Sequence, residues 1–319
     1  MKITRGLHNA DPARGCALTI GNFDGVHRGH QALLARLAVL ARELAVPAAM
    51  LTFEPHPVEL LAPQRAPARL TRFREKMRVL AAQPIEQVIC VRFDRAFSSM
   101  TPQTFIDDVL CSRLGVRHLL IGDDFRFGCG GEGSFQTLLA AARAGRFQVT
   151  RVDTVLHAGA RVSSTRIRDL LARGDLSAAA QLLGRRYAVC GRVSRGQRIG
   201  RSIGFPTANI ALRRNASPLA GVYAVTAHDA TGAVLRGVAN VGRRPTVGAS
   251  ETRVEVHLLD FDGDLYGREL RVCFHRLLRA EQRFPGLAAL SEQIARDVAA
   301  ARAVHEALAD DAGSTGCDG

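Results

Sequence analysis

The feature of this sequence that most constrains its fold is a change in hydrophobic pattern near Gly184. Before that point, strand-like segments (ALTIGNF, AAMLTF, QVICVRF and RHLLIGDDF) alternate with a proline-bounded loop and with helix-like stretches. We expect helices over residues 30–44, 102–114, 135–144, 164–172 and 176–183. Repeated strand–helix units predict a Rossmann-like parallel sheet with helices on both faces, which binds ligands at the carboxyl ends of its strands.

After Tyr187, short alternating segments (YAVCGRVS, GVYAVTAHD, LRGVANVG, RVEVHLLD and ELRVCFHRLL) are separated by glycine-rich or polar turns. This pattern predicts an antiparallel sheet or small β-barrel, followed by a closing helix over residues 287–308. We therefore expect an α/β chain with two domains, residues 1–183 and 184–309, and a disordered tail at residues 310–319.

The segment GNFDGVHRGH, residues 21–30, joins the first apolar strand to a helix that opens near Arg28. Its three glycines are Gly21, Gly25 and Gly29, which allow unusual backbone conformations and a close approach of phosphates. The helix start beyond them offers unpaired N–H groups. His27 and His30 stand one helical turn apart on the same face. Two imidazoles so placed can bond the oxygens of a triphosphate and stabilise charge as the α-phosphate is attacked.

Other interpretations of this segment are open. A histidine near a helix start is often a cap or a surface group, and a glycine-rich turn alone is weak support for function. A histidine pair can also bind metal, but a zinc site needs three or four ligands, and no Cys-x-x-Cys or third nearby histidine supplies them.

A second element, RVSSTRIR at residues 161–168, also opens a helix. Ser163, Ser164 or Thr165 can cap that helix. Capping does not explain the presence of Arg166 and Arg168. Two guanidiniums beside hydroxyls at a helix start form an anion site that suits the β- and γ-phosphates of ATP.

A third element, GFPTAN at residues 204–209, lies in the barrel-like half. Pro206 keeps the backbone extended, so Thr207 and Asn209 point to one side, as on a strand. Hydroxyl and amide oxygens suit Mg²⁺ that carries nucleotide phosphates, although the segment could also be a simple turn.

The formal charge of +13 raises the question of nucleic-acid binding. The basic residues are dispersed, with no run longer than two, and aromatic residues make up only 5% of the chain, so the aromatic–basic surface of a single-strand binder is not evident. Only Lys2 and Lys76 are lysines, and neither follows the glycine loop of a P-loop, so any phosphoryl transfer must use another scaffold.

The seven cysteines are scattered and odd in number, which favours reduced thiols in the cytoplasm. No apolar run reaches the roughly 20 residues of a membrane helix, and the N-terminal segment lacks the apolar stretch of a signal peptide. We expect small-molecule partners, with no membrane and no nucleic acid.

Taken together, the HxGH element at residues 27–30 and the SSTRIR element at residues 163–168 resemble the HIGH-type nucleotidyltransferases. The segments TFEPHP, GDDFRFG and GFPTANI narrow the resemblance to the bifunctional bacterial riboflavin kinase/FMN adenylyltransferase (FAD synthetase) family, in the expected order and up to about Asp310. The resemblance implies a nucleotidyltransferase domain followed by a β-barrel riboflavin kinase domain with a terminal helix.

The resemblance also assigns roles to residues. His27, His30 and Glu255 would be catalytic, Glu255 as the base that accepts the proton of the ribityl hydroxyl. Thr207 and Asn209 would bind Mg²⁺. The ATP and phosphate contacts would be Gly21, Phe23, Gly25, Gly29, Asp124, Ser163, Ser164, Thr165, Arg166, Arg168, Gly196, Gly200 and Gly204. The flavin contacts would be Phe53, Pro55, His56, Pro57, Arg279 and Phe284. Asp124 stands where family members can carry Asn, which leaves its role open.

The resemblance implies two reactions. ATP would phosphorylate riboflavin to FMN in the C-terminal domain, and the N-terminal domain would join AMP to FMN, giving FAD and pyrophosphate, with Mg²⁺ in both steps. A monofunctional HIGH-type adenylyltransferase is the nearest rival, but it leaves the GFPTAN domain unexplained. An RNA-binding protein is the rival from another class, and a steep salt dependence of RNA affinity would support it.

Overall fold

The computed structural model describes residues 1–196, 200, 203–212, 216–246 and 249–312, and the chain forms two compact units. The first comprises Met1–Pro67 and Thr71–Ser164, and the second comprises Ala68–Leu70 and the chain from Thr165 onward. By packing, the helices at residues 164–172 and 176–183 thus belong almost wholly to the second unit. The boundary at 183/184 concerns which segment carries which reaction, and it stays a prediction.

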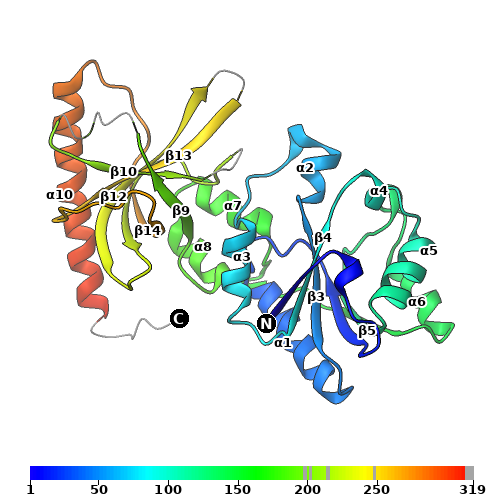
Figure 1. Cartoon of the computed structure of the whole chain (residues 1–319). Helices are drawn as coiled ribbons and strands as arrows, with labels where there is room; N and C mark the ends of the chain where they lie inside the picture. The colour runs from blue at the N-terminus through cyan, green and yellow to red at the C-terminus, as the bar shows by residue number, and fades with distance from the viewer. Residues whose placement is uncertain (197–199, 201–202, 213–215, 247–248, 313–319) are drawn as a thin grey trace. The chain divides into compact units, whose positions relative to one another are not determined.

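The first unit is built on a parallel six-stranded sheet in the order β1–β4–β3–β2–β5–β6, as the strand–helix alternation predicts (Figure 1). Its strands are β1 (Lys2–Arg5), β2 (Cys16–Ile20), β3 (Ala48–Glu54), β4 (Gln87–Arg92), β5 (Val116–Gly122) and β6 (Gln148–Val152). All five residues of β2 are buried, as expected for a central strand covered on both faces.

The longer helices of the first unit pack on this sheet through apolar faces. They are α1 (Arg28–Glu43), α3 (Phe73–Leu80), α6 (Phe135–Arg143) and the π-helix η3 (Phe105–Arg113). Short elements complete the unit: η1 (Leu7–Asn9), α2 (Pro57–Leu61), η2 (Pro63–Arg65), α4 (Arg95–Ser98), α5 (Pro102–Thr104), η4 (Cys129–Gly131) and the hairpin β7 (Leu156–His157) and β8 (Ala160–Arg161). The helix expected over residues 102–114 is therefore one turn of α-helix continued as a π-helix.

The strand order places a topological switch point at β2. From β2 the chain proceeds to β3 and β4 on one side, and it returns to β5 and β6 on the other. In open parallel sheets, ligands bind outside the carboxyl ends of the strands at such a point. The loops that follow β2 and β5 are therefore expected to form a ligand-binding site.

The second unit contains a closed antiparallel barrel in the order β10–β13–β12–β11–β14–β9, with β9 pairing back to β10. Its strands are β9 (Ala188–Ser194), β10 (Thr207–Ala211), β11 (Gly221–His228), β12 (Val234–Thr246), β13 (Ala249–Leu258) and β14 (Glu269–Arg279). The two expected helices are present as α7 (Ser164–Ala172) and α8 (Leu176–Leu183). The prediction of a small barrel is thus confirmed.

The closing helix α10 (Leu287–Ala312) lies along the outside of the barrel (Figure 1). Its Ala301 packs on Val222, Ala224 and Val238. The helix continues past Leu308, where the sequence places its end, and residues 313–319 of the expected tail lie outside the described residues. Within the part of the chain that the structure describes, no helix is both long and apolar enough to cross a bilayer.

Candidate active sites

The loop after β2 carries the GNFDGVHRGH segment to the switch point of the first sheet. Helix α1 begins at Arg28, as predicted, and His27 is its N-cap, with His27 Nδ1 accepting the His30 backbone N–H at 3.3 Å. The capping interpretation of His27 is therefore correct, and it places both imidazoles at the positive end of the helix dipole. We name residues 21–27 the nucleotide loop.

The two imidazoles of this segment stack on each other. Their ring centroids are 3.6 Å apart and the ring planes differ by 15°, while Phe23 lies 4.8 Å from the His30 ring. Burial, then His27 and then Lys76, hold the pKa of His30 well below its usual range, so His30 is a neutral imidazole. Among the described residues, His30 Nδ1 is buried without a hydrogen-bond partner, which leaves it available to a ligand.

The backbone of the nucleotide loop is held in conformations that most residues avoid. Phe23 has φ 49° and Val26 has φ 42°, the latter a rare value for a β-branched residue, and Gly25 has φ 82°. A Cβ on Gly29 would lie 3.2 Å from the His27 ring, so Gly29 lets that ring pack closely on the helix start. Strain of this kind at a switch point is typical of a functional loop.

Side chains from elsewhere in the first unit fix this loop. Asp24 is buried, and its Oδ1 accepts the Thr71 backbone N–H at 2.9 Å and the Thr71 hydroxyl at 3.2 Å. The Thr71 hydroxyl oxygen in turn accepts the Gly25 N–H at 3.0 Å. Ser164 donates from its hydroxyl to the Asp24 carbonyl at 2.8 Å, which brings the start of the SSTRIR element to the loop.

The remaining SSTRIR residues are distributed around the start of α7. Ser163 precedes the helix, and Thr165, Arg166 and Arg168 stand in its first two turns. Arg168 Nε donates to the Ala68 carbonyl at 2.6 Å within the second unit. Their role as phosphate ligands stays a prediction.

The predicted flavin residues of the first unit lie at the end of β3, which contains Phe53, and in the turn that follows it. Phe53 belongs to a run of six phenylalanines with successive ring centroids 5.3–6.1 Å apart: Phe53, Phe93, Phe97, Phe105, Phe127 and Phe125. Pro55 follows a cis peptide bond, His56 caps α2 by accepting the Val58 N–H at 3.3 Å, and Pro57 opens that helix. Phe53 thus lies at the border of the core, close in sequence to the capped start of α2.

The loop after β5 lies at the same switch point and carries the GDDFRFG segment. Arg161 pairs with Asp123 at 3.4 Å and with Asp124 at 2.8 Å. A hydrogen bond from Thr154 is the main cause of the lowered pKa of Asp123. The Asp124 carboxylate is largely exposed and belongs to this ion-pair group, and its predicted ATP contact is not tested by the structure.

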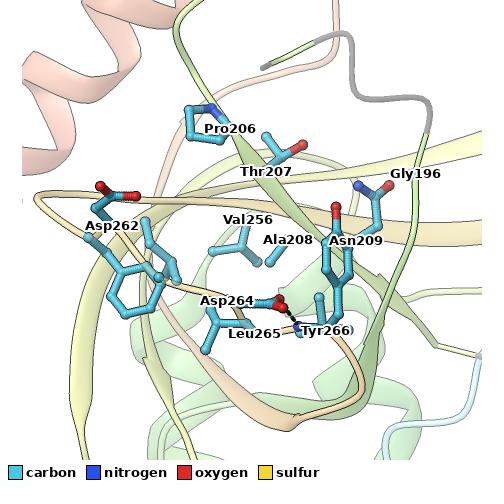
Figure 2. A pocket seen from close by; sticks show the side chains of 14 residues that line it. Gly196, Pro206, Thr207, Ala208, Asn209, Val256, Asp262, Asp264, Leu265 and Tyr266 are labelled. Carbon is cyan, nitrogen blue, oxygen red and sulfur yellow. Dashed lines mark hydrogen bonds between the residues drawn. The ribbon is translucent and has the colours of Figure 1, made fainter.

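In the second unit, GFPTAN leads into β10 beside a hollow of about 170 Å³ (Figure 2). Thr207 and Asn209 line it from β10, and the loop after β13 lines it with Asp262, Asp264 and Tyr266. Asp264 Oδ1 accepts the Tyr266 N–H at 2.8 Å, which shapes this loop. The hollow therefore joins hydroxyl, amide and carboxylate oxygens to an aromatic ring.

The strand register places Glu255 directly opposite Asn209. Side chains that face each other across antiparallel strands have Cβ atoms about 4.5–5.5 Å apart, so Glu255 and Asn209 start from adjacent positions on one face, although Glu255 is not among the described residues that line the hollow. Asn209 is 7% exposed, and a Cβ on Gly196 would lie 2.3 Å from Asn209 Nδ2. Gly196 thus leaves the room that the Asn209 side chain occupies.

Gly200 and Gly204, two further glycines predicted to contact ATP, lie just before β10 in the sequence. Phe205 donates its N–H to the Gly200 carbonyl at 2.7 Å, and Gly204 has φ 85°. Residues 197–199 and 201–202, on either side of Gly200, lie outside the described residues.

The flavin contacts predicted near the end of the barrel lie at its junction with α10. Arg279 forms a two-pronged ion pair with the buried Asp297, with Nε–Oδ1 at 2.9 Å and an Nη2–Oδ2 distance of 2.8 Å. Its guanidinium also lies 5.5 Å from the Phe284 ring. Arg279 therefore already has a packing role, and its predicted contact with flavin stays a prediction.

Three groups at these sites were not predicted from the sequence. They are Thr71, which fixes the nucleotide loop, Lys76, which lies beneath it, and the Asp264–Tyr266 turn at the barrel hollow. The turn segment DFDGDLYG was visible only as a polar linker. Lys76 stood out as one of two lysines, but its position could not be inferred from that.

Comparisons with known proteins match the two halves of the chain to two families. A family model described as FAD synthetase matches residues 9–166, and one described as riboflavin kinase matches residues 183–305. The bifunctional riboflavin kinase/FMN adenylyltransferases of Escherichia coli K12 and Pseudomonas fluorescens are 51% and 49% identical to this chain. Each alignment covers 95% of this chain, with 97% of the first relative and 98% of the second.

A solved structure from Streptococcus pneumoniae, named a macrolide-efflux protein, is also similar. It has a TM-score of 0.79 and 27% identity over 95% of this chain and 99% of its own. Its similarity over nearly the whole length supports the two-part fold. On the identity and coverage of its relatives and on the two family models, the chain belongs to the bifunctional riboflavin kinase/FMN adenylyltransferase family.

Proposed function

We propose that the two reactions of this family are divided between two segments of the chain, residues 1–183 and residues 184–309. As a family member, the chain phosphorylates riboflavin to FMN with ATP and adenylylates FMN to FAD with release of pyrophosphate. We assign adenylyl transfer to the nucleotide loop and α1, and phosphorylation to the barrel hollow beside β10. The predicted limits of the two domains, 1–183 and 184–309, belong to this proposal.

The stacked His27–His30 pair carries the assignment of adenylyl transfer. An ionised phosphate oxygen of FMN attacks the α-phosphorus of ATP, and the bond to the bridging oxygen of the departing pyrophosphate breaks. The neutral His30 donates to a non-bridging oxygen, and the positive end of the α1 dipole adds positive potential as charge develops there. Arg166 and Arg168 bind the pyrophosphate oxygens in this proposal.

The cross-strand pair of Asn209 and Glu255 supports the assignment of the kinase site. Glu255 accepts the proton of the ribityl hydroxyl, whose oxygen forms a bond to the γ-phosphorus as the bond to ADP breaks. The oxygens of Thr207 and Asn209 are the hard donors that Mg²⁺ prefers. Because Gly196 has no Cβ, the Asn209 side chain has room in this position, which supports its role as a ligand. When bound there, Mg²⁺ would supply neutralising charge to the nucleotide phosphates.

We further propose that the enzyme works in the cytoplasm on small molecules alone, with Mg·ATP required for both steps. The six cysteines of the described residues are free, which fits a reducing compartment.

One pair of variants tests the division of labour. His30→Ala should lower FAD formation from FMN by about 10²-fold, a loss typical of removing one transition-state donor, while riboflavin phosphorylation continues. Glu255→Gln should show the reverse pattern. Each variant serves as the folding control for the other, with flavins separated by chromatography after reaction. Equal loss of both activities in either variant would refute the assignment.

A further inference from the structure

Lys76 is a buried lysine in a chain whose basic residues are almost all arginines. It lies on α3 and is 4% exposed, whereas Lys2, the other lysine, is exposed at the start of the sheet. Burying an ammonium group is unfavourable unless its donors are satisfied. A lysine kept in such a place calls for an explanation from its contacts.

The ammonium group of Lys76 reaches the backbone of the nucleotide loop. Its Nζ donates to the Asn22 carbonyl at 2.7 Å and to the Thr52 hydroxyl oxygen at 3.3 Å. Thr52 in turn donates to the same Asn22 carbonyl at 3.4 Å. The Asn22 peptide, one residue before the strained Phe23, is thus held from α3 and from β3 at once.

Lys76 also acts electrostatically on the histidine pair. The charged groups that act on His30 are His27 at the start of its own helix and Lys76 from α3. Asp24, the carboxylate of the same loop, is bonded to Thr71. After burial and His27, the positive charge of Lys76 is the next cause that lowers the pKa of His30.

We propose that Lys76 is a positioning residue for adenylyl transfer, which fixes the Asn22 carbonyl and thereby the loop that carries His27 and His30. This inference rests on the proposed role of the two histidines. A compact ammonium on a flexible stem fits between the Asn22 carbonyl and the Thr52 hydroxyl, whereas a guanidinium is larger and directs its donors as a planar fork. A displacement of reacting groups by about 1 Å can lower a rate by about 10²-fold.

The test uses the full-length enzyme with Lys76→Met, Lys76→Arg and, as the matched control for loss of one lysine charge, Lys2→Met. Rates of FAD formation from FMN are measured from pH 5 to 9 at saturating substrates, with riboflavin phosphorylation as the folding control. Lys76→Met should lower kcat for adenylylation by about 10²-fold with a much smaller change in the KM for FMN.

The pH profile separates positioning from simple destabilisation. Without the Lys76 charge the pKa of His30 rises, so the acid limb of kcat that protonation of His30 produces should move to higher pH in Lys76→Met. Lys76→Arg keeps the charge, so its acid limb should stay in place although its kcat falls. If Lys76→Met lowers kcat with an unmoved acid limb, or keeps wild-type kcat, the inference is wrong. If His30→Ala itself keeps wild-type kcat, the proposed function fails first. Should Lys76→Met not fold, an acid limb in Lys76→Arg that moves to higher pH would overturn the inference, and an unmoved limb with a lowered kcat would support it.

Discussion

His275 should make the stability of the barrel unit depend on pH. Its Nε2 lies 2.9 Å from the Thr226 hydroxyl, the Arg186 guanidinium donates to its Nδ1, and the His305 ring of α10 is 5.9 Å away. Because Nδ1 accepts a bond from a cation, protonation there would break the contact. Burial, then Arg186, His305 and His228, lower the pKa of His275 to about 3.

The sign and size of the effect follow from proton linkage. Between about pH 3 and the ordinary histidine pKa of 6.5, the unfolded chain binds a proton at this residue and the native chain does not, so stability falls as pH falls. One histidine contributes about 1.4 kcal/mol per pH unit in that window, or about 2 kcal/mol between pH 6.5 and pH 5. The lowered pKa values of His228 and His305 act in the same direction.

The tyrosines provide an assay specific to this unit. The chain has no Trp, and its three tyrosines, Tyr187, Tyr223 and Tyr266, all belong to the second unit. Urea unfolding followed by tyrosine fluorescence at pH 7.5 and pH 5 gives the stability change for the wild type and for His275→Gln, which cannot titrate. The variant should lose about 2 kcal/mol less on acidification. Equal losses in both proteins would refute the reasoning.

Three further predictions concern the sites and the units. Asn209→Ala should weaken productive Mg·ATP binding and be partly relieved by excess Mg²⁺, whereas the kcat defect of Glu255→Gln should persist across a magnesium titration of riboflavin phosphorylation. Asp297→Ala should lower the unfolding free energy of the second unit by about 3–5 kcal/mol, because it leaves the Arg279 charge without its carboxylate, and urea unfolding measures this. A fragment from Gly184 onward should make FMN from riboflavin. A fragment from Thr165 onward should do the same and be more stable, since it keeps the packing of Gly174 on Leu277. Formation of FAD by either fragment would contradict the division of the two reactions.

The two-part fold could be predicted because each half has a regular hydrophobic pattern. Helix α3 was missed because FREKMRVL is short and half of its residues are charged, although its apolar residues gather on one face and Glu75 and Lys76 are buried beside them. Strand β1 was missed because KITR is short and polar. The order of strands in either sheet is not encoded in local periodicity, and it follows only from pairing over long distances.

The site was predictable to the extent that its residues are contiguous. The His27–His30 pair, the helix start at Arg28 and the strand at Thr207 all follow from spacing. The contact of Lys76 with Asn22 joins residues 54 positions apart, and the pairing of Asn209 with Glu255 depends on the register of two strands. No single segment carries a signal for such contacts.

The strand orders of the two units also bear on how copies of the chain can associate. Where its six strands pair in a ring the barrel has no free strand edge, although the ends of β12 and β13 next to their connection pair only with each other. In the part of the chain that the structure describes, the edge strands of the parallel sheet are β1 of four residues and β6 of five. Lys2 and Arg5 are exposed on the first of these edges, and Arg151 is exposed on the second. Short, charged edges resist the backbone pairing by which sheets of different molecules fuse into aggregates. Association of native copies at the parallel sheet would therefore have to proceed through side chains of helices and loops, and the ends of β12 and β13 are the place in the barrel where backbone pairing with another copy could begin without opening the ring.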